Sequence, residues 1–279
     1  VFINSSLLPG KLNLAEAKLK GKSKKEIFFS TNICHPSMAN NELSGPVLSS
    51  ALLRYIKDNY NKSYYSYRFL FVPETIGSLA YLSKNYKKMK KDIIAGFTLS
   101  CVGDERSFSH VVSPNYNLAD EALSSALIGL NNVKVYSFLE RGSDERQYCS
   151  PGIELPVCGF CRSKYGKYSE YHTNKDNFDV MTQKGLQDSF KVMQNIIDAF
   201  EAGLFPKTQT LGEPHLGKRK LYDDTDTIKR KRNRLDLLAY SNGKRNIFNI
   251  CKKINQPLEE VLLNIKKFKK LKLLKTKYF

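Results

Sequence analysis

Apolar residues before Phe205 follow two alternating patterns, short continuous runs and longer stretches with helical spacing. The continuous runs are rich in β-branched and aromatic residues, as strands buried on both faces usually are. Between them, apolar positions recur at i, i+3 and i+4, which predicts amphipathic helices. The alternation predicts an α/β fold with a mostly parallel central sheet flanked by helices. The predicted strands are 26–33, 67–73, 93–101, 133–138 and 155–160, and the predicted helices are 45–60, 78–91, 120–130 and 182–203.

After Phe205 the periodicity stops, and prolines, glycines and charges dominate until about Lys229. Two short helical stretches follow, 247–254 and 258–274, joined by a link that ends in Pro257. Proline at a helix start is a common N-terminal signal. Two short helices with a tight turn predict a winged-helix-like module. We therefore expect an α/β domain over 1–206, a linker over 207–230 and the small C-terminal module over 231–279.

Charge is concentrated in this tail. The net charge is +18, and from Leu211 onward 19 Lys and Arg oppose 7 Asp and Glu, whereas residues 1–210 carry 26 against 20. A basic helical module can bind nucleic acid, because lysine and arginine replace the counterions of phosphates, or it can dock onto a protein. The sequence leaves both partners open for residues 228–279.

Size and cysteine content narrow the setting of the protein. The 279 residues suffice for one sizeable domain with a small appendage. No run approaches the roughly 18–20 apolar residues that a membrane span needs. The six cysteines lack the spacing of a disulfide framework, so we expect reduced thiols and a cytoplasmic protein. Because the chain starts at Val1 without a methionine, a fragment of a longer polypeptide is expected. The oligomeric state stays open.

Residues able to bind a metal follow several of the predicted strands, where α/β folds bind their ligands. His35, Glu74 and Asp104 each follow a strand, and His172 comes from a later loop. Imidazoles and carboxylates suit Zn²⁺, and a carboxylate outside the ligand set can take a proton from metal-bound water. Each residue also has an ordinary structural role available, such as an Asx turn at Asp104 or a helix cap at Glu74.

An ordered set of motifs resembles the co-catalytic zinc aminopeptidase superfamily, which includes leucyl aminopeptidases, glutamate carboxypeptidases and glutaminyl cyclases. The match is closer still to a bacterial aminopeptidase-like branch that carries a C-terminal winged helix and is associated with surface-polysaccharide gene clusters. The resemblance covers Glu26–Gly203 and implies the zinc-peptidase type of α/β fold. The motifs are CHPSMANNELSG (34–45), PETIGS (73–78), CVGD (101–104), GSDERQYCSPGI (142–153) and YHT (171–173).

The resemblance also implies a reaction and its residues. It implies a zinc-dependent hydrolase acting on a peptide or an aminoacyl amide, with Glu74 as the general base that activates metal-bound water. The implied metal ligands are His35, Asp104 and His172, and Asn41 stands where the family has an aspartate that bridges two metals. The residues expected to face the substrate or to support the site from behind are Asp144, Glu145, Arg146 and Tyr148.

Three positions depart from the family pattern by losing a carboxylate. Asn41 replaces the bridging aspartate, Thr75 replaces a ligand glutamate, and Ser37 replaces the aspartate that follows the first histidine. Fewer negative charges favour one zinc ion over two, with Glu42 or Glu145 as a substitute carboxylate.

Whether the chain is an active enzyme is therefore left open by the sequence. One alternative is a weakened or inactive protein that binds a ligand in the pocket and is linked to surface-polysaccharide assembly. The other alternative is a nucleic-acid-binding regulator that acts through the basic tail.

Overall fold

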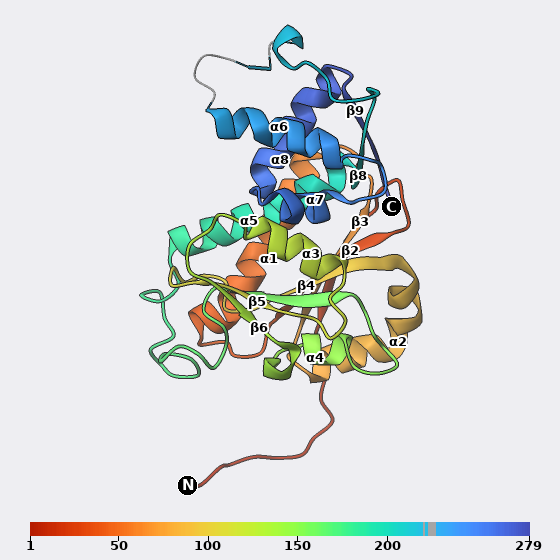
Figure 1. Cartoon of the computed structure of the whole chain (residues 1–279). Helices are drawn as coiled ribbons and strands as arrows, with labels where there is room; N and C mark the ends of the chain where they lie inside the picture. Colours follow the sequence, from red (N-terminus) through yellow and green to blue (C-terminus); the bar gives the residue numbers. More distant parts are fainter. Residues whose placement is uncertain (220, 223–226) are drawn as a thin grey trace.

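The computed structural model describes residues 1–219, 221–222 and 227–279, and Figure 1 shows an α/β domain that carries a helical module on one side. The central sheet has the strand order β1-β3-β2-β4-β7-β5-β6. Its middle strands β3, β2, β4 and β7 are parallel, whereas β1 and β5 run antiparallel to their neighbours β3 and β7. The strands are β1 (Ala15–Leu19), β2 (Glu26–Asn32), β3 (Ser66–Val72), β4 (Ile93–Leu99), β5 (Phe108–Val111), β6 (Val133–Tyr136) and β7 (Val157–Cys161).

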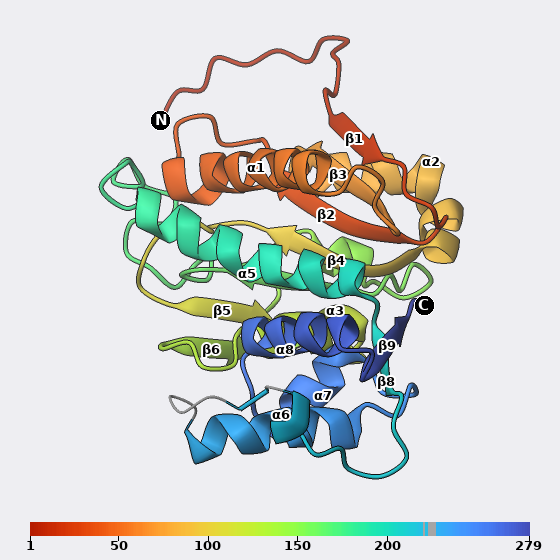
Figure 2. The same cartoon turned by 90° about the horizontal axis from the view of Figure 1, so that it is seen from above.

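Helices cover both faces of this sheet. The helices α1, α3 and α5 lie on one face, and α2 and α4 lie on the other (Figures 1 and 2). Each face has its own apolar core, in which the buried residues of the strands pack against the helices. The elements are α1 (Ser44–Asn59), α2 (Ile76–Asp92), α3 (Leu118–Ala126), α4 (Glu145–Tyr148) and α5 (Gln183–Ala202), with the short turns η1 (Ala39–Leu43), η2 (Phe138–Glu140) and η3 (Gly217–Arg219).

The predicted fold class is confirmed, with one correction at the sheet edge. Every residue of β2 and β4 is buried, as the continuous apolar runs predicted. The run 133–138 was expected to be a buried strand as well, but β6 is the last strand of the sheet and Val135 is 65% exposed. Composition alone cannot separate an edge strand from a central one, because both favour β-branched residues.

The tail forms the predicted winged-helix arrangement of three helices and a two-stranded sheet. These elements are α6 (Ile228–Tyr240), α7 (Ile247–Ile254), α8 (Leu258–Lys270), β8 (Phe205–Thr208) and β9 (Leu274–Lys277). Because β8 pairs with β9, the tail module already begins at Phe205. The expected linker 207–230 contains part of β8, and residues 220 and 223–226 of that linker lie outside the described residues. The domain limits remain a prediction.

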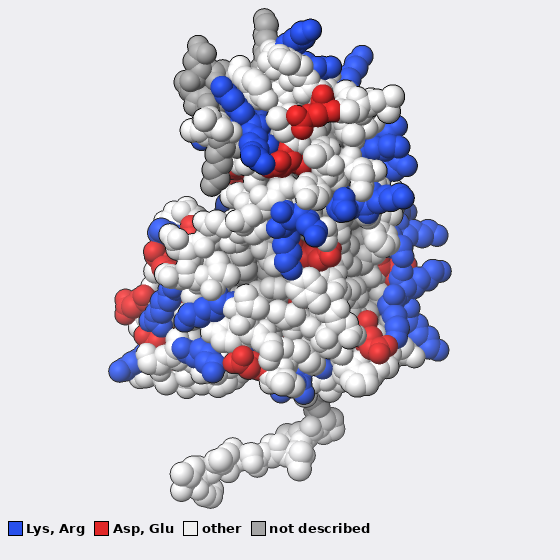
Figure 3. Space-filling model, in the orientation of Figure 1, with Lys and Arg blue, Asp and Glu red and all other residues white. Residues whose placement is uncertain are grey.

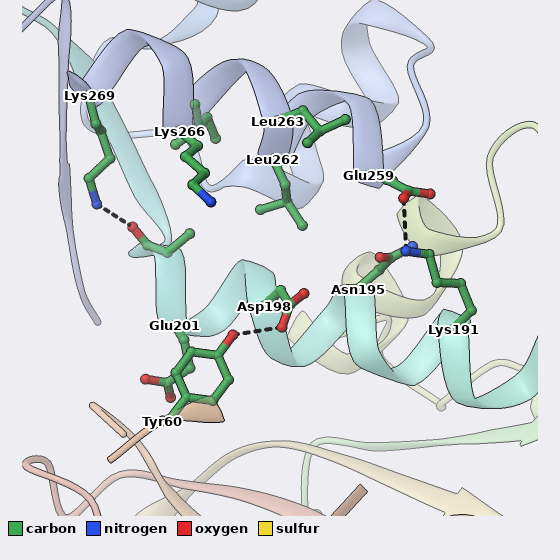
Figure 4. Close-up of a pocket in the computed structure, with 12 residues that line it drawn as sticks. Tyr60, Lys191, Asn195, Asp198, Glu201, Glu259, Leu262, Leu263, Lys266 and Lys269 are labelled. Atoms are coloured by element: carbon green, nitrogen blue, oxygen red, sulfur yellow. Dashed lines mark hydrogen bonds and ion pairs between the residues drawn. The ribbon is translucent and has the colours of Figure 1, made fainter. Parts of the chain in front are cut away.

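One apolar core joins the tail to the α/β domain. The rings of Phe248 on α7 and Phe200 on α5 meet edge to face, with centroids 5.2 Å apart. Between α5 and α8 lies a cavity of about 490 Å³, which Figure 4 shows with the ion pair of Lys191 and Glu259 on its border. Those two side chains are 2.8 Å apart. The module is thus packed against the sheet domain instead of being tethered loosely.

Among the described residues, none of the helices has both the length and the apolar character required to cross a bilayer.

Candidate metal centre

The main cluster of metal-binding side chains forms where β2 ends and the chain turns into α1. Glu42 Oε1 lies 2.9 Å from His35 Nδ1, and Glu42 Oε2 accepts a 2.9 Å hydrogen bond from the backbone N–H of Cys34. The Cys34 thiol lies 3.4 Å from the same imidazole nitrogen. These three residues place their ligand atoms within 4.8 Å of one another. A thiol, an imidazole and a carboxylate this close together suit a divalent cation such as Zn²⁺.

The turn η1 brings Glu42 to this position. Both carboxylate oxygens of Asp176 accept hydrogen bonds from η1, from the backbone N–H of Asn40 at 2.6 Å and that of Asn41 at 3.1 Å. Asn41 is 5% exposed, and within the described part of the chain its side-chain Oδ1 has no hydrogen-bond partner. A buried amide oxygen without a donor is costly, so a cation beside it would be stabilising.

A distant loop brings the His172 ring beside the His35 ring. Its ring centroid lies 4.7 Å from that of His35, and it stacks on Tyr171 at 4.0 Å. The His172 backbone has a φ of 57°, an uncommon conformation for a residue other than glycine. The structure thus brings together two histidines that are 137 positions apart in the sequence.

Glu74 lies beside this cluster, two residues after the end of β3. Burial raises the pKa of its carboxyl group, and the nearby Glu42 and Glu145 raise it further, whereas a hydrogen bond from Ser143 and the charge of Arg146 lower it. Burial also raises the pKa of the Cys34 thiol, to about 11. At neutral pH Cys34 is therefore protonated, which makes it a poor nucleophile.

Asp104, one of the expected metal ligands, is used elsewhere. Its carboxylate accepts hydrogen bonds from the backbone N–H groups of Arg106 and Ser163, at 2.9 and 2.8 Å. The Ser163 hydroxyl and Asn40 Nδ2 donate two more, and the residue is 1% exposed. Four donors engage both oxygens, so Asp104 ties loops together. The carboxylate that pairs with His35 in the structure is Glu42.

The loop that leads into α4 supports Glu74 from behind. Asp144 Oδ1 accepts hydrogen bonds from the Thr75 backbone N–H at 2.8 Å and from the Ser78 hydroxyl at 2.9 Å. Arg146 Nη2 lies 2.5 Å from Thr75 Oγ1. Thr75 has a φ of 63°, which is strained for a β-branched side chain. Two side chains of this loop therefore hold an unfavourable turn right after the candidate base.

Glu145 and Tyr148 have structural roles. Glu145 Oε1 accepts hydrogen bonds from the Gly142 backbone at 2.9 Å and from the Tyr165 hydroxyl at 2.5 Å, so it fixes the loop. Tyr148 is fully buried, and its hydroxyl lies 2.8 Å from Ser30 Oγ. Both residues support the site from inside the protein.

The donors nearest His35 are a second imidazole and one carboxylate. His35, His172 and Glu42 offer two imidazoles and one carboxylate, with the Asn41 oxygen nearby. Thr75 is already engaged by Arg146 and does not replace the lost carboxylate ligand. The sequence analysis missed the anchoring by Asp176 and Ser143, since hydrogen bonds between distant loops leave no local signal.

A second group of metal-binding residue types is enclosed in the core. His110, Asp120 and Cys158 are all buried, with 2.8 Å between His110 Nε2 and Asp120 Oδ1. Asp120 also accepts a hydrogen bond from the backbone N–H of Asn117 and caps α3. This group is structural, and all six cysteines are free among the described residues.

Known proteins share this fold. A Clostridium acetobutylicum protein, described as a candidate polysaccharide biosynthesis protein with an aminopeptidase-like domain, is 40% identical over 230 residues, which is 80% of this chain and 51% of that protein. A crystal structure from Clostridium acetobutylicum, described as a candidate peptidase, has a TM-score of 0.81 at 34% identity, covering 94% of this chain and 60% of the other. The chain thus spans about half the length of the curated relative.

More distant structures confirm the predicted resemblance at the level of the fold. The zinc aminopeptidase of Bacillus subtilis has a TM-score of 0.55 at 18% identity, covering 66% of this chain and 48% of the enzyme. Glutaminyl cyclases have the same fold. Residues 204–276 match a winged helix-turn-helix family, and residues 5–203 match a family described as a domain of unknown function, DUF4910. Since that match spans most of the chain, the protein belongs to the DUF4910 family.

Proposed function

We propose that the α/β domain is a zinc-dependent, aminopeptidase-like hydrolase that acts on a peptide or an aminoacyl amide. The observation that carries this proposal is the surroundings of His35: its Nδ1 lies 2.9 Å from Glu42 Oε1, and its ring centroid lies 4.7 Å from that of His172. These three residues would hold one zinc ion. The peptidase fold of the relatives supports the reaction class.

Glu74 is the proposed general base. When bound, zinc would lower the pKa of a water molecule and polarise the substrate carbonyl. Glu74 would accept the proton from that water at its carboxylate, and partial burial strengthens it as a base because burial raises its pKa. Ser143 holds the Glu74 carboxylate, and the strained Thr75 backbone fixes its direction.

In this proposal Glu42, and not Asp104, is the carboxylate ligand of the zinc ion. Its carboxylate faces His35, whereas the Asp104 carboxylate is surrounded by four donors. Asn41 Oδ1 is a further neutral ligand in this proposal. With one carboxylate in reach, the site would hold one zinc ion instead of two.

Arg146 is proposed to face the substrate. Its Nε is buried without a hydrogen-bond partner among the described residues, and its charge acts on Glu74. A carboxylate of the substrate would fit this guanidinium. The description of the curated relative suggests that the substrate belongs to polysaccharide biosynthesis. The free cysteines agree with a reducing, cytoplasmic setting.

Metal analysis by mass spectrometry tests the proposal. We expect about one zinc per chain in protein purified without chelators, lost in His35→Ala and in Glu42→Ala, and retained in Asp104→Asn and Glu74→Gln. Glu74→Gln should lower hydrolysis of aminoacyl amides by about 100-fold or more with the metal in place. A protein that binds no zinc, even when zinc is supplied, would contradict the proposal. Zinc binding without hydrolysis would support the inactive pocket-binding alternative.

We propose that the winged helix is a docking module and not a reader of nucleic acid. Four residues of α8 are buried against the rest of the protein, and Glu259 at its start pairs with Lys191 on α5. The helix that follows the turn of a helix-turn-helix is the one that enters the DNA groove, and here one face of that helix, α8, packs against α5 of the α/β domain.

Retention on DNA tests the docking role. We expect no retention at physiological salt, and no change when Arg230, Lys231 and Arg232 are replaced by alanine. Salt-sensitive binding that this triple substitution abolishes would support the nucleic-acid alternative instead.

A further inference from the structure

A second cavity lies on the sheet edge formed by β1, away from the metal centre. Its volume is about 670 Å³, within the range of small-molecule sites. Its walls come from the end of β1, the turn before β2 and the last turns of α2. We call it the lysine groove, and its lining residues are Lys18, Leu19, Lys20, Lys24, Glu26, Ser66, Tyr67, Lys87, Lys88, Lys91 and Asp92.

Most of the positive charge in the lysine groove has no partner. Lys18 pairs with Glu16 at 3.1 Å. The other five lysines of the groove make no ion pair with any residue that the structure describes. Of the two acids in the lining, Glu26 is bound by the buried Arg68 at 2.6 Å, which leaves Asp92. Figure 3 shows lysine and arginine side chains gathered along the edge of the molecule that carries α2.

The groove is separate from the proposed active site. Glu26 and Ser66 are the first residues of β2 and β3, and Asp92 directly precedes β4. His35 and Glu74 follow the carboxyl ends of the same strands. Seven-residue strands separate the two edges, a distance of roughly 20 Å. A ligand in the groove therefore would not touch the metal centre.

We propose that the lysine groove binds a small ligand that carries a diphosphate group. Like charges gathered around one cavity repel each other, and a multiply charged anion between them removes that repulsion. Lysine is a common phosphate ligand, because its ammonium acts as a compact point charge. The lysines come from two walls, β1 with the turn after it and the last turns of α2, so in this proposal each phosphate of a diphosphate pairs with one wall, whereas a single sulfate pairs with fewer lysines.

The test is calorimetry of the full chain with inorganic pyrophosphate, with a nucleoside diphosphate and with sulfate. We expect pyrophosphate to bind about tenfold more tightly than sulfate. If the natural ligand carries its diphosphate on a nucleoside, the nucleoside diphosphate will bind more tightly than pyrophosphate; equal affinity will indicate recognition of the diphosphate alone. In either case the Glu74→Gln variant should bind pyrophosphate as tightly as the unchanged protein does. The groove proposal can therefore hold even if the hydrolase proposal fails.

Two triple variants separate a site from a general charge effect. Replacing Lys87, Lys88 and Lys91 by glutamine should weaken pyrophosphate binding by about tenfold or more. Replacing three exposed lysines of α8, Lys266, Lys267 and Lys270, removes the same charge elsewhere and should leave the affinity within about twofold. Equal losses in both variants, or equal affinity for pyrophosphate and sulfate, would overturn the proposal.

Discussion

Asp144 shows how one buried carboxyl group couples the candidate site to stability. Its pKa is raised to about 7, mainly by burial and also by the neighbouring carboxylates of Glu74 and Glu145, although hydrogen bonds from Thr75 and Ser78 oppose the rise. Its Oδ2 has no partner among the described residues. The folded protein thus holds a proton at Asp144 at pH values where the unfolded chain has released it.

The expected consequence is a loss of stability as pH rises. The folded pKa lies above the unfolded value of 3.8, so the contribution of Asp144 is complete below about pH 4 and is lost as pH rises through about 7. Asp144→Asn should remove this dependence. Between pH 4 and pH 8, urea denaturation should show the unchanged protein losing on the order of 2–4 kcal/mol relative to the variant. If the free energy of unfolding changes with pH in the same way for both proteins, Asp144 is not the source of the pH dependence.

At the scale of elements, the start of α1 depends on a close contact with the sheet. Gly45 faces β2 and β4, and a Cβ atom there would lie 2.0 Å from Thr31 Oγ1 and 2.5 Å from the Leu99 carbonyl oxygen. The Thr31 hydroxyl already donates to that carbonyl at 2.9 Å. Only glycine lets α1 approach near enough for the preceding turn η1 to carry Glu42 to His35.

Gly45→Ala should therefore affect both stability and the metal site. We expect a loss of about 1–3 kcal/mol in the free energy of unfolding, because the new methyl group must displace backbone. Zinc content should fall as well, since Glu42 moves with the turn. The matched control is Gly10→Ala in the exposed N-terminal segment, where an added Cβ meets nothing nearer than 4.0 Å. If Gly45→Ala is as stable as Gly10→Ala, the start of α1 does not need the close contact with the sheet that glycine permits.

At the scale of the whole molecule, the tail and the α/β domain share one apolar core. The apolar core runs without interruption from the sheet through α5 into α7 and α8. Phe248 is fully buried in it. Because the two parts share this core, they are expected to unfold together.

Phe248→Ala tests this unity. We expect it to destabilise the whole chain by about 3–5 kcal/mol in a single denaturation transition, followed by far-UV and near-UV circular dichroism. Leu263→Ala on α8, at a position that is 56% exposed, is the control and should cost under about 0.5 kcal/mol. Two separate transitions would show that the tail folds independently, if Phe248→Ala shifts the transition of the tail and leaves that of the α/β domain unchanged.

The sequence by itself determined the fold class, most element positions and several parts of the candidate site. Continuous apolar runs and helical spacing are local properties, so β2, β4, α1 and α5 were predicted within a few residues of their observed limits. The same pattern marked His35, Glu74 and His172 as strand-end or loop residues with metal chemistry. The short strands β1 and β5 were missed because few residues carry their pattern.

Only the tertiary structure decided how the residues of the site are combined. It placed Glu42 at His35, surrounded Asp104 with donors and enclosed Tyr148 in the core. It also joined the lysines of separate segments into one groove. These outcomes depend on contacts between positions far apart in the chain. Each contact is made by the packing of whole elements, so neither spacing nor composition along the sequence records it.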